Sequence, residues 1–188
     1  MKINKKLILI ILTGITLLAA CTNDYTFEDF FHKKMEENTQ EYDEEVQYSY
    51  SLIHQEENVV HSNDALAVFT ENNLQGEQIF IAYFEREGGH WNWKQTRGAE
   101  WDTPVKWSAM HEEPYIYSGA ISDNSIKEVH AGQMQAKIIH IKEDKRFWYV
   151  ISREKDVEVK MVMADGTEKI VEEIDEEMLK EWQDKKTE

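Results

Sequence analysis

The sequence predicts a mainly β or α+β fold: a compact antiparallel sheet, a sandwich or an open barrel, with an amphipathic helix at the C-terminus. From residue 46 onward, short runs of alternating or wholly apolar residues are separated by turn residues, as in antiparallel sheets. The C-terminal segment instead spaces its apolar residues as a helix does. Since no internal repeat interrupts residues 46–188, we expect them to form one globular domain.

The strand prediction depends on the alternation of side chains along each run. Residues 78–85 are apolar on both alternating faces, which indicates a central strand that is buried on both sides. Gly88-Gly89 then favours a tight turn into the next strand, and Asp165-Gly166 favours a second hairpin. The expected strands are residues 48–53, 65–70, 78–85, 90–96, 115–121, 127–130, 135–141, 146–152, 157–163 and 167–171.

The expected C-terminal helix covers residues 172–185. Ile174, Met178, Leu179 and Trp182 form an apolar stripe on an otherwise charged segment. Acidic residues near its start and lysines near its end complement the helix dipole.

The first 20 residues have the three parts of a secretory signal peptide. Lys2, Lys5 and Lys6 give a positive head, residues 7–18 are apolar apart from two threonines and one glycine, and two alanines follow. The apolar run is shorter than the about 20 residues that a helix needs to cross a bilayer. We therefore expect residues 1–20 to be removed, with a permanent transmembrane anchor as the alternative.

The four residues Leu18-Ala19-Ala20-Cys21 resemble the lipobox of bacterial lipoproteins, and Cys21 is the only cysteine of the chain. The resemblance implies that cleavage occurs before Cys21, that this residue carries a diacylglycerol, and that the protein is anchored on the extracytoplasmic face of the cell membrane. Residues 115–123, Ile126, 136–139 and 146–150 are also similar to small, uncharacterised lipoproteins of Gram-positive bacteria, for which there is no biochemical activity to carry over. The alternative is an ordinary secretory signal that ends by chance in a cysteine.

Residues 21–45 are expected to form the lipidated cysteine and an acidic tether, partly helical or disordered. Phe27, Phe30, Phe31 and Met35 have the spacing of one helix face. The alternative is that this aromatic cluster docks on the domain or on a partner.

The charge of the chain is strongly negative, −16 at pH 7. Removal of residues 1–20 takes away three lysines and no acidic residue, so the mature protein is more acidic still. A surface without a basic patch disfavours nucleic acid as a partner and disfavours contact with anionic lipid headgroups. We therefore expect the membrane to be a partner through the N-terminal lipid alone.

No cofactor or metal site is predicted. The sequence has no G-x-S-x-G elbow, no glycine-rich phosphate loop and no dinucleotide fingerprint. Its seven histidines show no i, i+4 pair, and Pro114 opposes a zinc-protease helix at His111. We expect no enzymatic activity; the alternative is an enzyme with dispersed acid/base residues such as His111, Glu112 and Glu113.

The aromatic residues are the remaining candidates for a binding surface. Trp91 and Trp93 alternate with polar residues as in a half-buried strand, so we assign them to the core. Trp101 and Trp107 lie in an irregular, proline-containing segment, where core and binding surface are equally plausible.

Two kinds of binding function follow from these observations. The first is a membrane-anchored domain that binds a protein or another envelope component. The second is a module that binds a carbohydrate or small ligand through exposed aromatic rings. The candidate residues for that module are Trp101, Trp107, Tyr115 and Tyr117.

Overall fold

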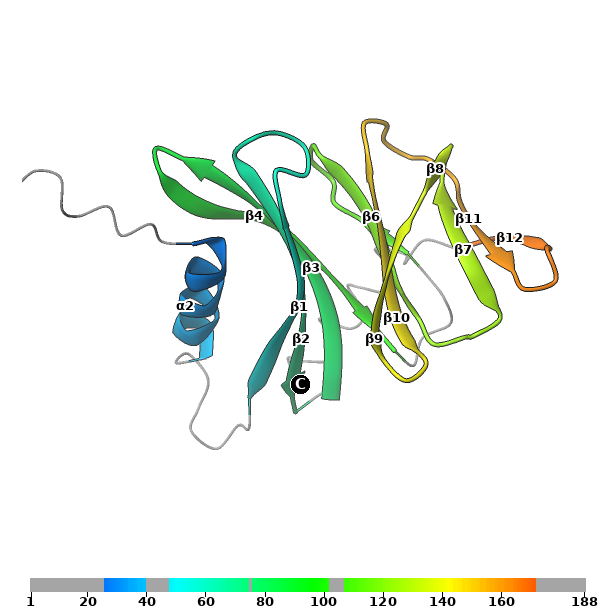
Figure 1. Ribbon diagram of the computed structural model, residues 1–188, viewed down its shortest axis with the longest axis horizontal. Coiled ribbons are helices and arrows are strands. Elements are labelled where there is room, and N and C mark those ends of the chain that lie inside the picture. Colours follow the sequence, from blue (N-terminus) through cyan, green and yellow to red (C-terminus); the bar gives the residue numbers. More distant parts are fainter. Residues whose placement is uncertain (1–25, 40–47, 75, 102–106, 172–188) are drawn as a thin grey trace, which may run out of the picture.

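The computed structural model describes residues 26–39, 48–74, 76–101 and 107–171. These residues contain one helix and twelve strands (Figure 1). The elements are α2 (Phe27–Thr39), β1 (Ser49–Glu57), β2 (Asp64–Asn73), β3 (Gly76–Glu87), β4 (His90–Glu100), β5 (Ser108–Ala109), β6 (Tyr115–Ile121), β7 (Ile126–Ala131), β8 (Met134–Gln135), β9 (Lys137–Lys142), β10 (Lys145–Ser152), β11 (Val159–Met163) and β12 (Glu168–Ile170).

The strands form three four-stranded sheets, and every strand pair is antiparallel. The first sheet has the order β1-β2-β3-β4, the second β5-β6-β10-β9 and the third β12-β11-β7-β8. The first sheet is therefore a simple meander. The rest of the chain passes back and forth between the second and third sheets, because β6 pairs with β10 and β7 pairs with β11.

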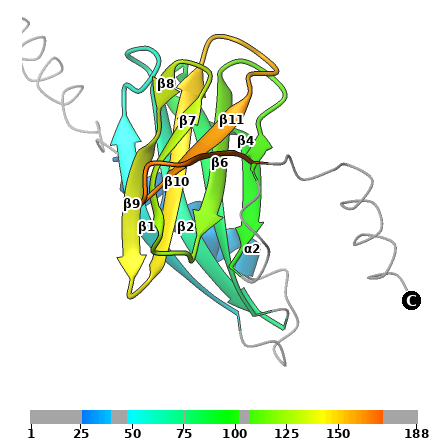
Figure 2. The same cartoon turned by 90° about the vertical axis from the view of Figure 1, so that its right-hand side faces the viewer.

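The elements are stacked in four layers: α2, the first sheet, the second sheet and the third sheet (Figure 1). The view from the side of the third sheet places α2 at the far end of the stack (Figure 2). Three separate groups of buried side chains fill the spaces between neighbouring layers. The two inner sheets are consequently covered on both faces.

Double-sided burial explains why the central strands are apolar throughout. On β2, Ala67 and Phe69 face α2, while Leu66 and Val68 pack toward the second sheet. Successive side chains of a strand point to opposite faces, so a strand between two layers needs apolar residues at both sets of positions. The same holds for β10, where neighbouring residues enter the two different cores on either side of the second sheet.

Helix α2 begins with a reciprocal cap. The backbone N–H of Asp29 donates to Thr26 Oγ1 at 3.1 Å, and Thr26 N–H donates to Asp29 Oδ2 at 3.2 Å. Phe27, Phe31 and Met35 are fully buried against the first sheet. Because these positions are four residues apart, they share one face of the helix.

This packing agrees with the alternative that the aromatic cluster of residues 27–35 docks on the domain. Residues 27–39 lie within the interval expected to be a tether, yet they form part of the folded body. The ring of Phe31 lies 5.2 Å from that of Phe69 and stacks on that of Trp93 at 6.2 Å. The aromatic face stabilises the helix although the surrounding sequence is acidic, since burial of apolar rings outweighs the weak propensity of a short isolated helix.

The mainly β, antiparallel prediction is confirmed. One expected strand is divided: residues 135–141 break at Ala136 into β8 and β9, which belong to different sheets. The two-residue strand β5 was not expected. The expected C-terminal helix at residues 172–185 lies outside the described residues, as does Cys21.

Candidate ligand-binding site

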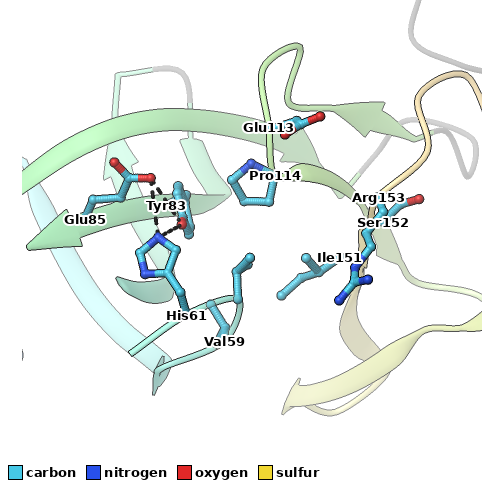
Figure 3. A pocket seen from close by; sticks show the side chains of 10 residues that line it. Val59, His61, Tyr83, Glu85, Glu113, Pro114, Ile151, Ser152 and Arg153 are labelled. Atoms are coloured by element: carbon cyan, nitrogen blue, oxygen red, sulfur yellow. Dashed lines mark hydrogen bonds and ion pairs between the residues drawn. The ribbon is translucent and has the colours of Figure 1, made fainter. Parts of the chain in front are cut away.

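A cavity of about 620 Å³ lies where the first and second sheets meet, at the end where β1 turns into β2 (Figure 3). We call it the inter-sheet pocket. The first sheet contributes the β1–β2 loop and β3, and the second contributes the segment before β6 and the end of β10. Its lining residues are Val59, Val60, His61, Tyr83, Glu85, Glu113, Pro114, Ile151, Ser152 and Arg153.

The β1–β2 loop is built around the carboxylate of Asp64, which is completely buried. The backbone N–H groups of Val59, Val60 and His61 donate to this carboxylate at 2.7, 3.0 and 2.9 Å. At the start of the loop Asn58 has a φ of 61°, a left-handed conformation that asparagine tolerates better than most residues. A buried carboxylate with this many donors fixes the loop, and with it the wall of the pocket.

Tyr83 links the loop to β3. Its hydroxyl donates to Asp64 Oδ2 at 3.1 Å and also lies 3.4 Å from both His61 Nε2 and Glu85 Oε1. Burial raises the pKa of Tyr83, and the negative charge of Asp64 raises it further. The phenol therefore remains a neutral hydrogen-bond donor under ordinary conditions.

Basic side chains lie close to the carboxylates of both Asp64 and Glu85 on this side of the pocket. Lys94 Nζ lies 3.2 Å from Glu85 Oε2, and His61 Nε2 lies 3.7 Å from Glu85 Oε1. His61 Nδ1 is also 3.7 Å from Asp64 Oδ2, so the imidazole lies between the carboxylates of Asp64 and Glu85. Figure 3 shows His61, Tyr83 and Glu85 grouped on one side of the pocket.

The other side combines apolar surface with two exposed charges. Pro114 is buried and Ile151 is half-buried, whereas Glu113 and Arg153 are exposed. Ser152 is buried, and its hydroxyl donates to Glu154 O and accepts from Glu154 N–H, each at 2.9 Å. The two hydroxyl groups of the pocket, those of Tyr83 and Ser152, are thus engaged within the protein.

The three acid/base candidates predicted from the sequence do not all line the pocket. Glu113 lines the pocket, while His111 and Glu112 are exposed and lie outside its lining. The backbone of Glu112 instead exchanges two hydrogen bonds with the Gln95 side chain, at 3.0 and 3.3 Å. Among the described residues, no group of three or more histidine, cysteine, aspartate or glutamate side chains is arranged to hold a metal ion.

The aromatic candidates for ligand stacking are mostly internal. Trp101 is 7% exposed in the core between the first and second sheets, and Trp107 is 8% exposed in the core between the second and third. Trp107 Nε1–H donates to Val171 O at 2.9 Å. Tyr117 is fully buried beside Trp107, and Tyr115 is half-buried against the same core. These rings support the fold, and a binding role for them gains no support.

The assignment of Trp91 and Trp93 to the core agrees with their packing under α2. Both are half-buried, and the ring centroid of Trp91 lies 5.1 Å from that of Phe27. A second cavity of about 440 Å³ lies beside them, between α2 and the β3–β4 turn.

Most of the pocket residues could not be identified from the sequence. Asp64 comes directly before the apolar run at residues 65–70. The usable signal was the acidic residue at the first position of a buried strand, where a carboxylate requires donors from the adjacent loop. Arg153 carries no local signal, and the sequence suggested Glu113 only as a possible acid/base residue. Both line the cavity because β6 pairs with β10.

Within the described residues, no helix is long and apolar enough to span a membrane. Comparisons of the chain with protein-family models, with curated proteins and with solved structures found no match.

Proposed function

We propose that this chain is a non-enzymatic, lipid-anchored binding protein of the extracytoplasmic membrane surface, and that the inter-sheet pocket is its ligand site. The observation that carries the proposal is the buried Asp64 carboxylate, which fixes the loop that forms one pocket wall. A wall held in place before binding lowers the entropic cost of taking up a ligand.

Pocket size and composition support a ligand of small-molecule or short-peptide dimensions. The volume of about 620 Å³ falls in the range of about 300–1,000 Å³ that is usual for such sites. Apolar residues of the lining supply contact area for a ligand, and a few charged groups can orient it. Since both pocket hydroxyls are engaged and no thiol lines the cavity, binding fits the described residues better than covalent catalysis.

The membrane anchor in this proposal depends on Leu18-Ala19-Ala20-Cys21. A diacylated cysteine binds a bilayer stably, because each buried CH₂ contributes about 0.8 kcal/mol and one short chain alone gives marginal binding. The negative charge of the protein keeps the domain off an anionic surface. The pocket then stays accessible to envelope components.

A thermal-shift screen of soluble small molecules and short peptides tests the proposal. The blocking variant is Val60→Trp, since Val60 lines the pocket and is 49% exposed, so that a larger ring enters the cavity without disturbing a core. The matched control is Leu74→Trp, because Leu74 is 82% exposed at the opposite end of β2. We expect ligands that stabilise the wild type and Leu74→Trp but not Val60→Trp. Equal responses in all three proteins, or none in any, would overturn the proposal.

A further inference from the structure

We propose that the inter-sheet pocket takes a zwitterionic ligand of amino-acid or short-peptide type, whose ammonium group pairs with Glu113 and whose carboxylate pairs with Arg153. This inference rests on the proposed function and specifies the ligand class for the same site.

The two assigned residues are the unneutralised charges of the pocket. Glu85 is paired with Lys94 at 3.2 Å, and His61 lies among Tyr83, Asp64 and Glu85. In contrast, neither Glu113 nor Arg153 makes a hydrogen bond or ion pair with any residue that the structure describes. In Figure 3 they lie away from His61 and Glu85, with Pro114 and Ile151 nearby.

The lining of the pocket also includes apolar residues. Pro114 is buried, and Val59 and Ile151 are half-buried and pack against the core between the first and second sheets. An aliphatic side chain or the backbone methylene groups of a short peptide can cover this surface and remove it from water. The ligand chemistry is therefore charged at two ends and apolar between them.

Opposite charges in one pocket disfavour ligands of a single sign. An anion would meet Glu113 in a chain whose net charge is −16, and a cation would meet Arg153. A like charge at short range is destabilising, whereas a ligand that carries both signs places each against its complement.

The experiment is isothermal titration of the full mature protein with the dipeptide alanyl-leucine. Three probes are used: the free dipeptide, its N-acetylated form and its C-terminal amide. We expect saturable binding of the free dipeptide and an affinity about fivefold lower for each blocked form, the size of a solvent-screened ion pair.

The variants assign each end of the ligand. Glu113→Gln should lower the affinity for the free dipeptide about fivefold. In this variant N-acetylation of the dipeptide should have no further effect on affinity, while C-terminal amidation should still lower it. Arg153→Gln should show the reverse pattern. The matched controls are Glu112→Gln and Lys155→Gln, which remove the same charges from exposed neighbours outside the pocket lining and should behave as wild type.

Absence of saturable dipeptide binding, or equal affinity for all three probes, would overturn the zwitterion assignment. If other compounds still protect the wild type but not Val60→Trp, the proposed function stands and this ligand class is wrong. If no compound distinguishes those two proteins, both proposals fail.

Discussion

Asp64 and Tyr83 lie on neighbouring strands of the first sheet, and the Tyr83 hydroxyl donates a 3.1 Å hydrogen bond to the buried Asp64 carboxylate. The same carboxylate accepts three backbone hydrogen bonds from the β1–β2 loop. The Asp64 side chain thus links the β1–β2 loop to Tyr83 on β3. The pocket depends on this connection.

Replacement of Asp64 should be far more destabilising than replacement of Tyr83. Asp64→Ala leaves three loop N–H groups without their acceptor and should lower the free energy of unfolding by about 3 kcal/mol. Tyr83→Phe removes the hydroxyl but leaves the three loop N–H donors on Asp64, and should cost about 1 kcal/mol. Urea denaturation measures both values. Equal costs for the two variants would contradict the central role of Asp64.

Helix α2 should contribute to the stability of the whole fold. Phe31→Ala removes a fully buried ring and should cost about 3–4 kcal/mol. Glu36→Ala, at an exposed position of the same helix, should stay within about 0.5 kcal/mol of wild type. Chemical denaturation of the mature protein tests the pair. Near-neutral behaviour of Phe31→Ala would mean that residues 27–39 act as a tether after all.

Stability should fall at alkaline pH. Burial raises the pKa of Tyr149 from 10.0 to about 12, so the folded state holds the phenol proton more tightly than the unfolded chain. This contribution is complete below pH 10 and is lost as the pH rises through about 12. Unfolding measured across that interval should show a decline that is shallower in Tyr149→Phe. A decline of equal slope in both proteins would count against this explanation.

Replacement of Cys21 tests the anchor. In the lipoprotein interpretation, Cys21→Ala leaves the precursor unprocessed or releases the protein from the membrane fraction. Fractionation followed by mass spectrometry of the N-terminal peptide distinguishes the two results. The matched substitution Thr22→Ala should leave processing and membrane association unchanged. Identical behaviour of Cys21→Ala and wild type would exclude lipid attachment at this residue.

The strands could be predicted from the sequence because their pattern is local. The continuous apolar runs within residues 65–70 and 78–85 reflect burial on both faces, and the structure places both segments in the middle of the first sheet. The division into three sheets could not be predicted, since it depends on pairings between strands far apart in the sequence, such as β6 with β10.

The position of the helix and the make-up of the pocket depend on residues far apart in the sequence. Thr26 and Asp29 form a capping box, and Phe27, Phe31 and Met35 form the buried face. The helix itself could therefore be predicted from local sequence. Its attachment to the first sheet depends on a surface supplied by other strands. The pocket likewise requires His61, Glu113 and Arg153 to line the same cavity, and no spacing in the sequence encodes that arrangement.

The most direct test of the central claim is a map of amide chemical-shift changes in the mature protein during titration with a ligand from the thermal-shift screen. We expect changes concentrated at residues 59–61, 83–85, 113 and 151–153, on the two sheets that line the pocket. Changes centred elsewhere, for example on α2 and the β3–β4 turn, would contradict the assignment of the inter-sheet pocket as the ligand site.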